Sequence, residues 1–287
     1  MSLEKVKDLL LEADRHQTAV LAFDAVDYVT VTAVIEGAQR AGCPVIVMLY
    51  PQMAQYCTLE GFTALVKETA SKARIPVGLH LDHCSDFEYI VHAMRKGFTS
   101  VMADGSMFPL EENIRFTSEV VHVAKVFGAD VEGELGHVGK GSCVEDYAEE
   151  TYTSPEEAKI FTEAAGVASL AVAFGSAHGV YRKEPRLDIR RLIEINEAID
   201  TPLVLHGGSG IPDEQIIEAF QNGINKMNIG TELFCGSQRY LKEFFIREEH
   251  LSGGCGHLDY AKECLAEYVR EKCKLTAFRS GSGKDVS

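Results

Sequence analysis

The chain has 287 residues, of which 46% are hydrophobic and 25% charged, with 8 Pro and 25 Gly. This composition excludes disordered, collagen-like and disulfide-rich proteins and allows a large buried core. The 28 basic and 43 acidic residues give a formal net charge of −15. A field of that sign repels nucleic acid and anionic membranes, so we expect neither as a partner.

The cysteines and the N-terminus predict a cytoplasmic protein. The 8 Cys are scattered without a CxxC pair, and the first residues carry no apolar leader. No apolar run approaches the roughly 20 residues that span a bilayer.

Short apolar runs rich in β-branched residues alternate with segments of helical spacing along the chain. The predicted strands are 18–23, 44–50, 76–81, 100–103, 130–135, 169–174, 202–205 and 224–229. The predicted helices between them are 29–41, 59–73, 87–96, 111–127, 155–165, 189–198 and 212–222. Strand-helix alternation implies a parallel sheet.

Eight such units predict an α/β fold, a (β/α)8 TIM barrel, with a doubly wound open sheet as the alternative. Helical patterning around 234–248 and 260–275 predicts extra C-terminal helices. We therefore expect a single domain, 1–287, in which 232–287 is a C-terminal helical extension.

Three histidines, His83, His178 and His206, follow three different predicted strands. A closed barrel brings the carboxyl ends of its strands to one mouth. Three imidazoles and an open coordination position make a catalytic zinc site. One such histidine alone is more often structural, but the three together predict a zinc site.

Four carboxylates converge on the same mouth: Asp82, Asp104, Glu132 and Glu134. A carboxylate there could serve as a general base or fix the orientation of a histidine ring. Glu132 lies two residues deeper in its strand than Glu134, and Lys226 two residues deeper than Asn228. We therefore expect a Lys226–Glu132 ion pair inside the barrel.

Glycine-rich segments follow the last two predicted strands, where barrel enzymes often bind a phosphate against backbone N–H groups. They are Gly207-Gly208-Ser209-Gly210 and Gly230-Thr231. Because tight turns also need glycine, these segments alone are weak signals. Arg182 and Lys183 could add a cationic contact.

Six ordered motifs stand at the ends of the last six predicted strands. They are His80-Leu81-Asp82-His83, Met102-Ala103-Asp104-Gly105-Ser106, Glu132-Gly133-Glu134-Leu135-Gly136, Gly175-Ser176-Ala177-His178-Gly179, Leu205-His206-Gly207-Gly208-Ser209-Gly210 and Asn228-Ile229-Gly230-Thr231. In this order they resemble the motifs of the class II, zinc-dependent fructose-bisphosphate and tagatose-bisphosphate aldolases, and the resemblance covers nearly the whole chain.

The resemblance implies roles for these residues. His83, His178 and His206 match the zinc ligands, Glu134 an alternate ligand, and Asp104 also belongs to the metal set. Two residues match catalytic positions: Asp82 the acid/base for the C4 hydroxyl proton, and Asn228 the residue beside the dihydroxyacetone phosphate skeleton. The loop 139–146 after the fifth predicted strand departs from the family pattern and is a few residues longer. Glu145 in this loop is the candidate for the residue that exchanges the C1 proton of the enediolate.

The resemblance also implies a phosphate-binding set: Gly179, Arg182, Gly207, Gly208, Ser209, Gly230 and Thr231. A monovalent cation near their backbone carbonyls is usual in the family. The implied reaction is the reversible cleavage of fructose 1,6- or tagatose 1,6-bisphosphate to dihydroxyacetone phosphate and glyceraldehyde 3-phosphate, and the implied assembly is a homo-oligomer, dimer or tetramer.

The first strand end departs from the family pattern. Where relatives have Phe-Asn-x-x-Asn, this chain has Phe23-Asp24-Ala25-Val26-Asp27, so two amides have become carboxylates. Carboxylates repel a phosphate dianion. Either the change is neutral, or the chain is an aldolase for another ketose 1-phosphate with a less anionic aldehyde half.

Three further alternatives stay open. A barrel metallohydrolase would use the same three histidines. A non-catalytic aldolase-like subunit would have no need of them. A class I aldolase would use a Schiff-base lysine, for which Lys226 is the one candidate on an inward strand face.

Overall fold

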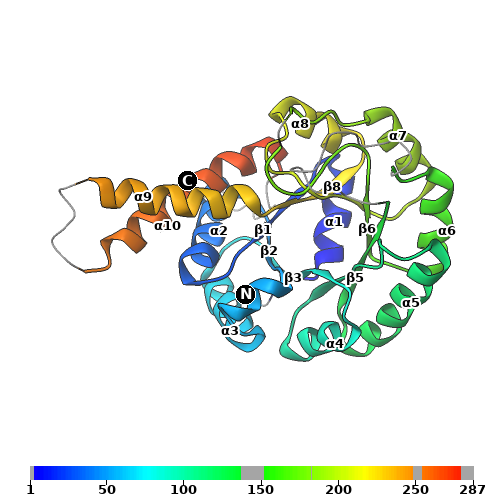
Figure 1. Cartoon of the computed structure of the whole chain (residues 1–287), viewed down its shortest axis with the longest axis horizontal. Coiled ribbons are helices and arrows are strands. Elements are labelled where there is room, and N and C mark those ends of the chain that lie inside the picture. The colour runs from blue at the N-terminus through cyan, green and yellow to red at the C-terminus, as the bar shows by residue number, and fades with distance from the viewer. Residues whose placement is uncertain (1–2, 137–151, 182, 248–253, 279–287) are drawn as a thin grey trace, which may run out of the picture.

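The computed structural model describes residues 3–136, 152–181, 183–247 and 254–278. Its centre is a closed parallel barrel in which each strand pairs with the next along the chain and β8 pairs with β1 (Figure 1). The strands are β1 Val20–Asp24, β2 Val45–Leu49, β3 Val77–Cys84, β4 Ser100–Ala103, β5 Asp130–Leu135, β6 Ser169–Val172, β7 Leu203–Leu205 and β8 Ile224–Ile229. The TIM-barrel prediction is confirmed.

The helices that follow the strands form the outer layer. They are α2 Tyr28–Ala41, α3 Leu59–Lys72, α4 Phe87–Lys96, α5 Leu110–Phe127, α6 Pro155–Ala165, α7 Ile189–Ala198 and α8 Asp213–Gln221, with the short 3-10 helix η1 Pro51–Gln55 after β2. Side chains that cap helix N-termini explain several of these starts. Asp86, for example, accepts a hydrogen bond from the backbone N–H of Tyr89 and so begins α4 at Phe87.

A helix that the sequence analysis did not predict, α1 Val6–Arg15, precedes the first strand. Its buried side chains, among them Val6 and Leu9, form a separate apolar cluster with Ile46 and Met48 of β2. Gly78 of β3 lies against Val6 and Leu9, where a larger side chain would clash. The helix thus closes the end of the barrel opposite the strand carboxyl ends.

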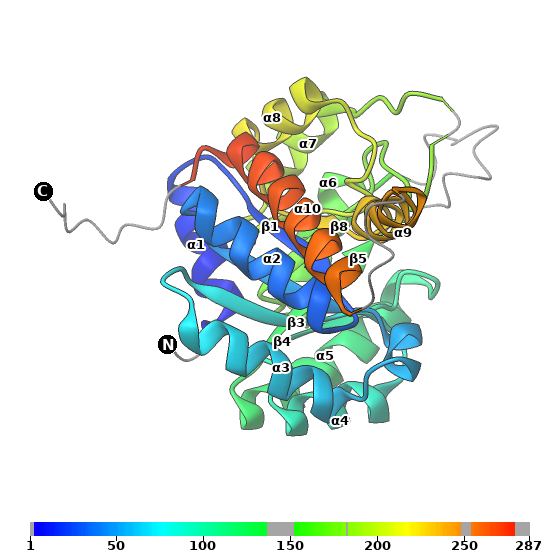
Figure 2. The same ribbon diagram turned by 90° about the vertical axis from the view of Figure 1, so that its left-hand side faces the viewer.

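The predicted C-terminal helices are present as α9 Thr231–Ile246 and α10 Gly256–Cys273, followed by the short 3-10 helix η5 Lys274–Thr276. The two helices extend together from one side of the barrel (Figure 1). α10 lies along α2 (Figure 2), and Gly37 permits this close approach because a Cβ there would meet the backbone oxygen of Ala266. None of the described helices is long and apolar enough to cross a membrane.

The barrel interior holds a buried ion pair. Lys226 Nζ on β8 lies 2.7 Å from Glu132 Oε2 on β5, and both side chains are 0% exposed, which confirms the pair expected from the sequence. Burial alone would raise the pKa of Glu132, but the Lys226 charge and a hydrogen bond with His206 hold it well below its usual range. The pair joins opposite walls of the barrel beneath its mouth.

We predict that Lys226→Met destabilises the fold by about 3–5 kcal/mol, because it leaves the Glu132 carboxylate buried without its cation. Urea unfolding of the purified protein measures this. The double variant Lys226→Met/Glu132→Gln should recover part of the loss. Lys72→Met, which breaks an exposed pair with Glu68 at 2.6 Å, is the matched control and should leave the midpoint almost unchanged. Equal effects of the two single variants would contradict the prediction.

Candidate active site

A cavity of about 700 Å³ opens at the carboxyl ends of the barrel strands. It is lined by residues that end or directly follow β1, β2, β3, β4, β5, β6, β7 and β8, so it sits where barrel enzymes place their chemistry. The sequence-predicted residues that line it are Asp82, His83, Asp104, Glu134, His178, Gly179, Gly207, Ser209, Asn228, Gly230 and Thr231. His206 lies directly beneath, fully buried.

The three predicted histidines meet. One ring nitrogen from each of His83, His178 and His206 lies within 4.8 Å of those of the other two. The ring centroid of His83 lies 4.7 Å from that of His178 and 4.6 Å from that of His206. The three histidines span more than a hundred residues of sequence from first to last, and the closed barrel brings their rings together as expected.

His83 is held in an unusual backbone conformation. Its φ is 30°, in the left-handed region that residues other than glycine rarely adopt. The pairing register between β3 and β4 also shifts here, between Leu81 and Cys84. Such strain costs on the order of 1–3 kcal/mol and concentrates at functional sites. The distorted end of β3 directs the His83 ring toward His178 and His206.

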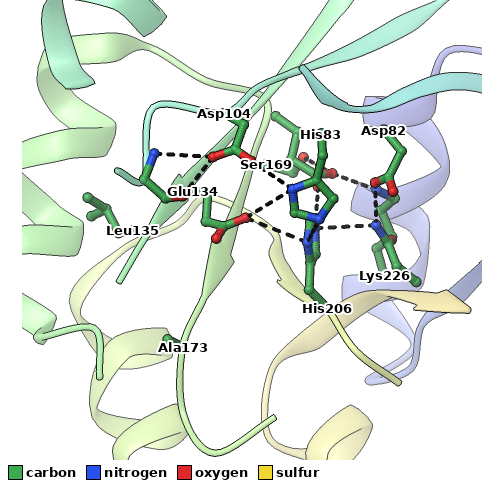
Figure 3. A network of polar contacts seen from close by, with 12 residues as sticks. Asp82, His83, Asp104, Glu134, Leu135, Ser169, Ala173, His206 and Lys226 are labelled. Carbon is green, nitrogen blue, oxygen red and sulfur yellow. Dashed lines mark hydrogen bonds and ion pairs between the residues drawn. The ribbon is translucent and has the colours of Figure 1, made fainter. Parts of the chain in front are cut away.

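Carboxylates contact two of the rings, each at the nitrogen that faces away from the other ring. His83 Nδ1 lies 2.8 Å from Asp104 Oδ2 (Figure 3). His206 Nε2 lies 2.9 Å from Glu132 Oε1. The remaining nitrogens, His83 Nε2 and His206 Nδ1, face each other at 2.8 Å. Metal-bound histidines typically present one nitrogen to the ion and the other to a carboxylate, so this arrangement fits a zinc ion.

Glu134 supplies a second sign of a metal site. Its Oε2 is buried and has no hydrogen-bond partner among the described residues. It lies 3.7 Å from His83 Nδ1 and 3.6 Å from His206 Nδ1 (Figure 3). A carboxylate oxygen left unpaired in a buried place is costly, and a cation between it and the rings would satisfy it.

The electrostatics of this cluster reflect crowded carboxylates. Burial would lower the pKa of His83, but Asp82, Asp104 and Glu134 outweigh it and raise that pKa to about 10. Burial raises the pKa of Glu134 to about 7. Asp104 is pulled the other way, because its hydrogen bond with His83 outweighs burial and lowers its pKa. These shifts reflect the crowding of carboxylates around the rings, a setting that favours a bound cation.

Asp82 and Asn228 form a pair beside the histidines. Asn228 Nδ2 donates to Asp82 Oδ1 at 3.0 Å across the barrel mouth, while Asn228 Oδ1 is buried and unpaired among the described residues. Asp82 is itself only 5% exposed. A fixed carboxylate in a cavity with an amide holding one of its oxygens is suited to take a proton from a bound hydroxyl.

Glycine-rich loops form the wall made by β6, β7 and β8. Gly179 and Gly207 have φ values of 92° and 66°, conformations that favour glycine. Tyr181 joins these loops, because its hydroxyl accepts from the N–H of Ala177 and donates to the carbonyl oxygen of Gly207. The sequence analysis missed this clamp, since one tyrosine in a loop carries no pattern.

Gly230 and Thr231 begin α9, so the N–H groups of its first turn lie at the cavity, and helix N-termini favour anions. Gly208 differs from the other predicted phosphate residues. It does not line the cavity, and its N–H donates to the carbonyl oxygen of Asn228 at 3.1 Å. Its lack of a side chain lets Met227 pack against it. Arg182 and Glu145 lie outside the described residues.

The two carboxylates that depart from the family pattern have different surroundings. Asp27 is the N-cap of α2 and exchanges hydrogen bonds with Thr30 in a capping box. Asp24 instead lines the cavity, and burial together with Asp82 raises its pKa well above the usual value. The Asp-x-x-Thr spacing was the signal that could have identified Asp27 as a cap.

We predict that Asp104→Asn weakens zinc binding about 10–100-fold, because it removes the carboxylate that orients His83. Calorimetric titration of the metal-stripped protein with zinc measures this. Asp86→Asn is the matched control: Asp86 lines the same cavity but caps α4, and asparagine caps equally well. Unchanged zinc affinity in Asp104→Asn would remove Asp104 from the metal site.

Comparisons with known proteins identify the family. Residues 4–281 match the family model described as fructose-bisphosphate aldolase class-II. The fold is similar to that of the YdjI aldolase from Escherichia coli K12, with 33% identity over 99% of this chain and 100% of that one and a TM-score of 0.87. It is also similar to a provisional fructose-1,6-bisphosphate aldolase from Coccidioides immitis, with 29% identity, coverage of 95% and 96%, and a TM-score of 0.83.

A fructose-bisphosphate aldolase from Campylobacter jejuni, at 22% identity, coverage of 96% of each chain and a TM-score of 0.82, shares the fold. The family model spans almost the whole chain, and the E. coli aldolase matches along its entire length. This protein belongs to the class II fructose-bisphosphate aldolase family.

Proposed function

We propose that the protein is a zinc-dependent class II aldolase that cleaves a ketose phosphate to dihydroxyacetone phosphate and an aldehyde, and joins them in reverse. The observation that carries this proposal is the meeting of His83, His178 and His206 in one cavity with Asp82. Fructose 1,6- and tagatose 1,6-bisphosphate, and ketose 1-phosphates, are the candidate substrates. We propose that residues 1–287 form a single domain, with 232–287 as its C-terminal helical extension.

The donor set supports zinc. His83, His178 and His206 would hold the ion, with Glu134 as an alternate ligand and Asp104 and Glu132 orienting the rings. When bound, zinc supplies a Lewis acid that stabilises negative charge developing on the substrate oxygens. We also propose a monovalent cation near the backbone carbonyls of the glycine loops, as the family resemblance implies.

Asp82 would start the cleavage. It takes the proton of the C4 hydroxyl, the C4–O bond becomes a carbonyl, and the C3–C4 bond breaks with its electron pair left on C3. Asn228, which holds Asp82 Oδ1 at 3.0 Å, orients the base and lies beside the three-carbon fragment. Glu145 would return a proton to the carbanionic carbon, numbered C1 of dihydroxyacetone phosphate, and so complete the turnover.

The phosphate of the dihydroxyacetone half would bind along the glycine loops. Gly179, Gly207, Ser209 and the first turn of α9 at Gly230 and Thr231 line one wall of the cavity. Backbone N–H groups at a helix N-terminus favour a dianion. Arg182 and Gly208 complete the set that the resemblance implies. Gly208 would then act by packing.

Other classes of function find less support. Lys226, the candidate Schiff-base lysine, is fully buried in an ion pair with Glu132, where it cannot reach a substrate carbonyl. A non-catalytic subunit would not need the intact cluster of histidines and Asp82. A metallohydrolase would need no phosphate-binding wall. We further propose a cytoplasmic homo-oligomer, dimer or tetramer, without nucleic acid or membrane as partner.

We predict that Asp82→Asn lowers kcat for cleavage about 10²–10⁴-fold, because the amide cannot accept the C4 hydroxyl proton. Release of dihydroxyacetone phosphate, followed with a coupled dehydrogenase, measures this. Zinc content, measured by atomic absorption, should stay that of the unsubstituted protein. Chelation should abolish activity and added zinc restore it. Activity that survives thorough metal removal, or a borohydride-trapped adduct on Lys226, would overturn the zinc mechanism.

A second prediction concerns Glu145. Glu145→Ala should abolish exchange of the C1 proton of dihydroxyacetone phosphate with tritiated water while zinc content stays unchanged, because zinc is held by other side chains. Asp146→Ala, the adjacent carboxylate, is the matched control and should retain exchange. Exchange at the normal rate in Glu145→Ala would exclude Glu145 from the mechanism.

A further inference from the structure

The cavity has two chemically different parts. One wall carries the glycine loops and the first turn of α9. The rest is formed by Asp24 at the end of β1 and by segments that follow β2, β3 and β4. These segments contribute neutral or acidic side chains: Tyr50, Gln52, Met53, Ser85, Asp86, Tyr89, Ser106 and Met107.

Charge in the cavity is strongly one-sided. Five carboxylates line it: Asp24, Asp82, Asp86, Asp104 and Glu134. Among the lining residues that the structure describes, none is Lys or Arg. The glycine wall can bind one phosphate through backbone N–H groups, but away from that wall the described residues offer no Lys or Arg for a second.

Asp24 has a buried carboxylate oxygen that lacks a hydrogen-bond donor among the described residues. Its side chain is 9% exposed, and its Oδ1 is buried without a hydrogen-bond partner among the described residues. Its Oδ2 packs against Gly230, where a Cβ would come within 2.6 Å of it. The carboxylate is thus fixed between Gly230 and the cavity, and a buried acceptor of this kind needs a ligand group that donates to it.

Tyr89 offers a second unsatisfied group in the same cavity. Its hydroxyl is buried and unpaired among the residues described, and its ring lines the cavity from α4. A hydroxyl can donate to a sugar oxygen or accept from a sugar hydroxyl. An acceptor oxygen at Asp24 and a two-way group at Tyr89 suit a chain of hydroxyls, whereas a phosphate dianion carries no proton that could satisfy Asp24 Oδ1.

We propose that Asp24 selects an aldehyde half that carries hydroxyls and no phosphate, so that the substrate is a ketose 1-phosphate and not a 1,6-bisphosphate. This inference rests on the proposed aldolase function. The glycine wall binds the one phosphate, on the dihydroxyacetone half. Asp24 accepts hydrogen bonds from hydroxyls of the polyhydroxy aldehyde, which leaves in cleavage and is attacked by the carbanionic carbon of dihydroxyacetone phosphate in condensation.

The experiment compares acceptors in the condensation direction. The holoenzyme is given dihydroxyacetone phosphate with unphosphorylated aldoses of three to five carbons, or with glyceraldehyde 3-phosphate. The best unphosphorylated aldose should exceed glyceraldehyde 3-phosphate in kcat/KM by about 10-fold or more, the effect of leaving one buried acceptor without a hydrogen bond. Equal or better use of glyceraldehyde 3-phosphate would overturn the inference.

Asp24→Asn tests the residue itself. The amide replaces an acceptor oxygen by an N–H donor, so it should lower the KM for glyceraldehyde 3-phosphate and raise the KM for the best aldose. The preference should shrink about 10-fold with little change in kcat. Asp27→Asn is the matched control, because Asp27 caps α2 and asparagine caps equally well. An unchanged preference in Asp24→Asn would remove Asp24 from specificity.

One further measurement distinguishes failure of the inference about Asp24 from failure of the aldolase proposal. Exchange of the C1 proton of dihydroxyacetone phosphate with solvent needs no aldehyde. Exchange together with a preference for glyceraldehyde 3-phosphate would leave the aldolase proposal intact and sink only the inference about Asp24. If the zinc-loaded protein neither exchanges that proton nor condenses any aldehyde, the aldolase proposal itself fails.

Discussion

The Glu132 carboxylate is the interaction on which the rest of the structure depends. It is fully buried, with one oxygen on Lys226 and the other on His206. An unpaired carboxylate at this depth would cost several kcal/mol, so the lysine that stabilises the barrel interior also keeps Glu132 ionised. Because it stays ionised, Glu132 can fix the His206 ring. The same carboxylate therefore contributes both to the stability of the core and to the orientation of a predicted zinc ligand.

The rest of the site follows from how a parallel barrel presents its strand ends. Inward positions alternate along each strand, so Glu132 and Glu134 on β5 face the same side as Lys226 and Asn228 on β8. The two deeper residues, Glu132 and Lys226, contact each other in the core, and the two shallower ones, Glu134 and Asn228, line the cavity. One layer of side chains thus supports the next.

Much of this could be predicted from the sequence. The spacing of apolar residues distinguishes the strand and the helix of each β/α unit. Closure of eight units into a barrel then brings together the histidines at the carboxyl ends of β3, β6 and β7. The depth argument for Lys226 and Glu132 used only the strand period, and it was right. Such inferences work because a strand leaves its side chains little directional freedom.

The features that the sequence did not predict depend on contacts between segments that are distant in the sequence. Helix α1 was missed, although its apolar residues are needed to close the barrel. The Tyr181 clamp and the packing role of Gly208 depend on exact distances between loops. Asp24 and Asp27 looked alike as substitutions of amides by carboxylates, yet one lines the cavity and the other caps a helix. Only three-dimensional neighbours distinguish them.

The pairing of β8 with β1, which joins Val20 to Lys226, has a consequence for biosynthesis. The strand that completes the ring is made about two hundred residues after its partner, and α10, which packs on α2, emerges later still. Contacts of such long sequence separation slow folding. On the ribosome the early strands must therefore wait with an open edge, and nascent chains of this protein should depend on chaperones until translation has ended.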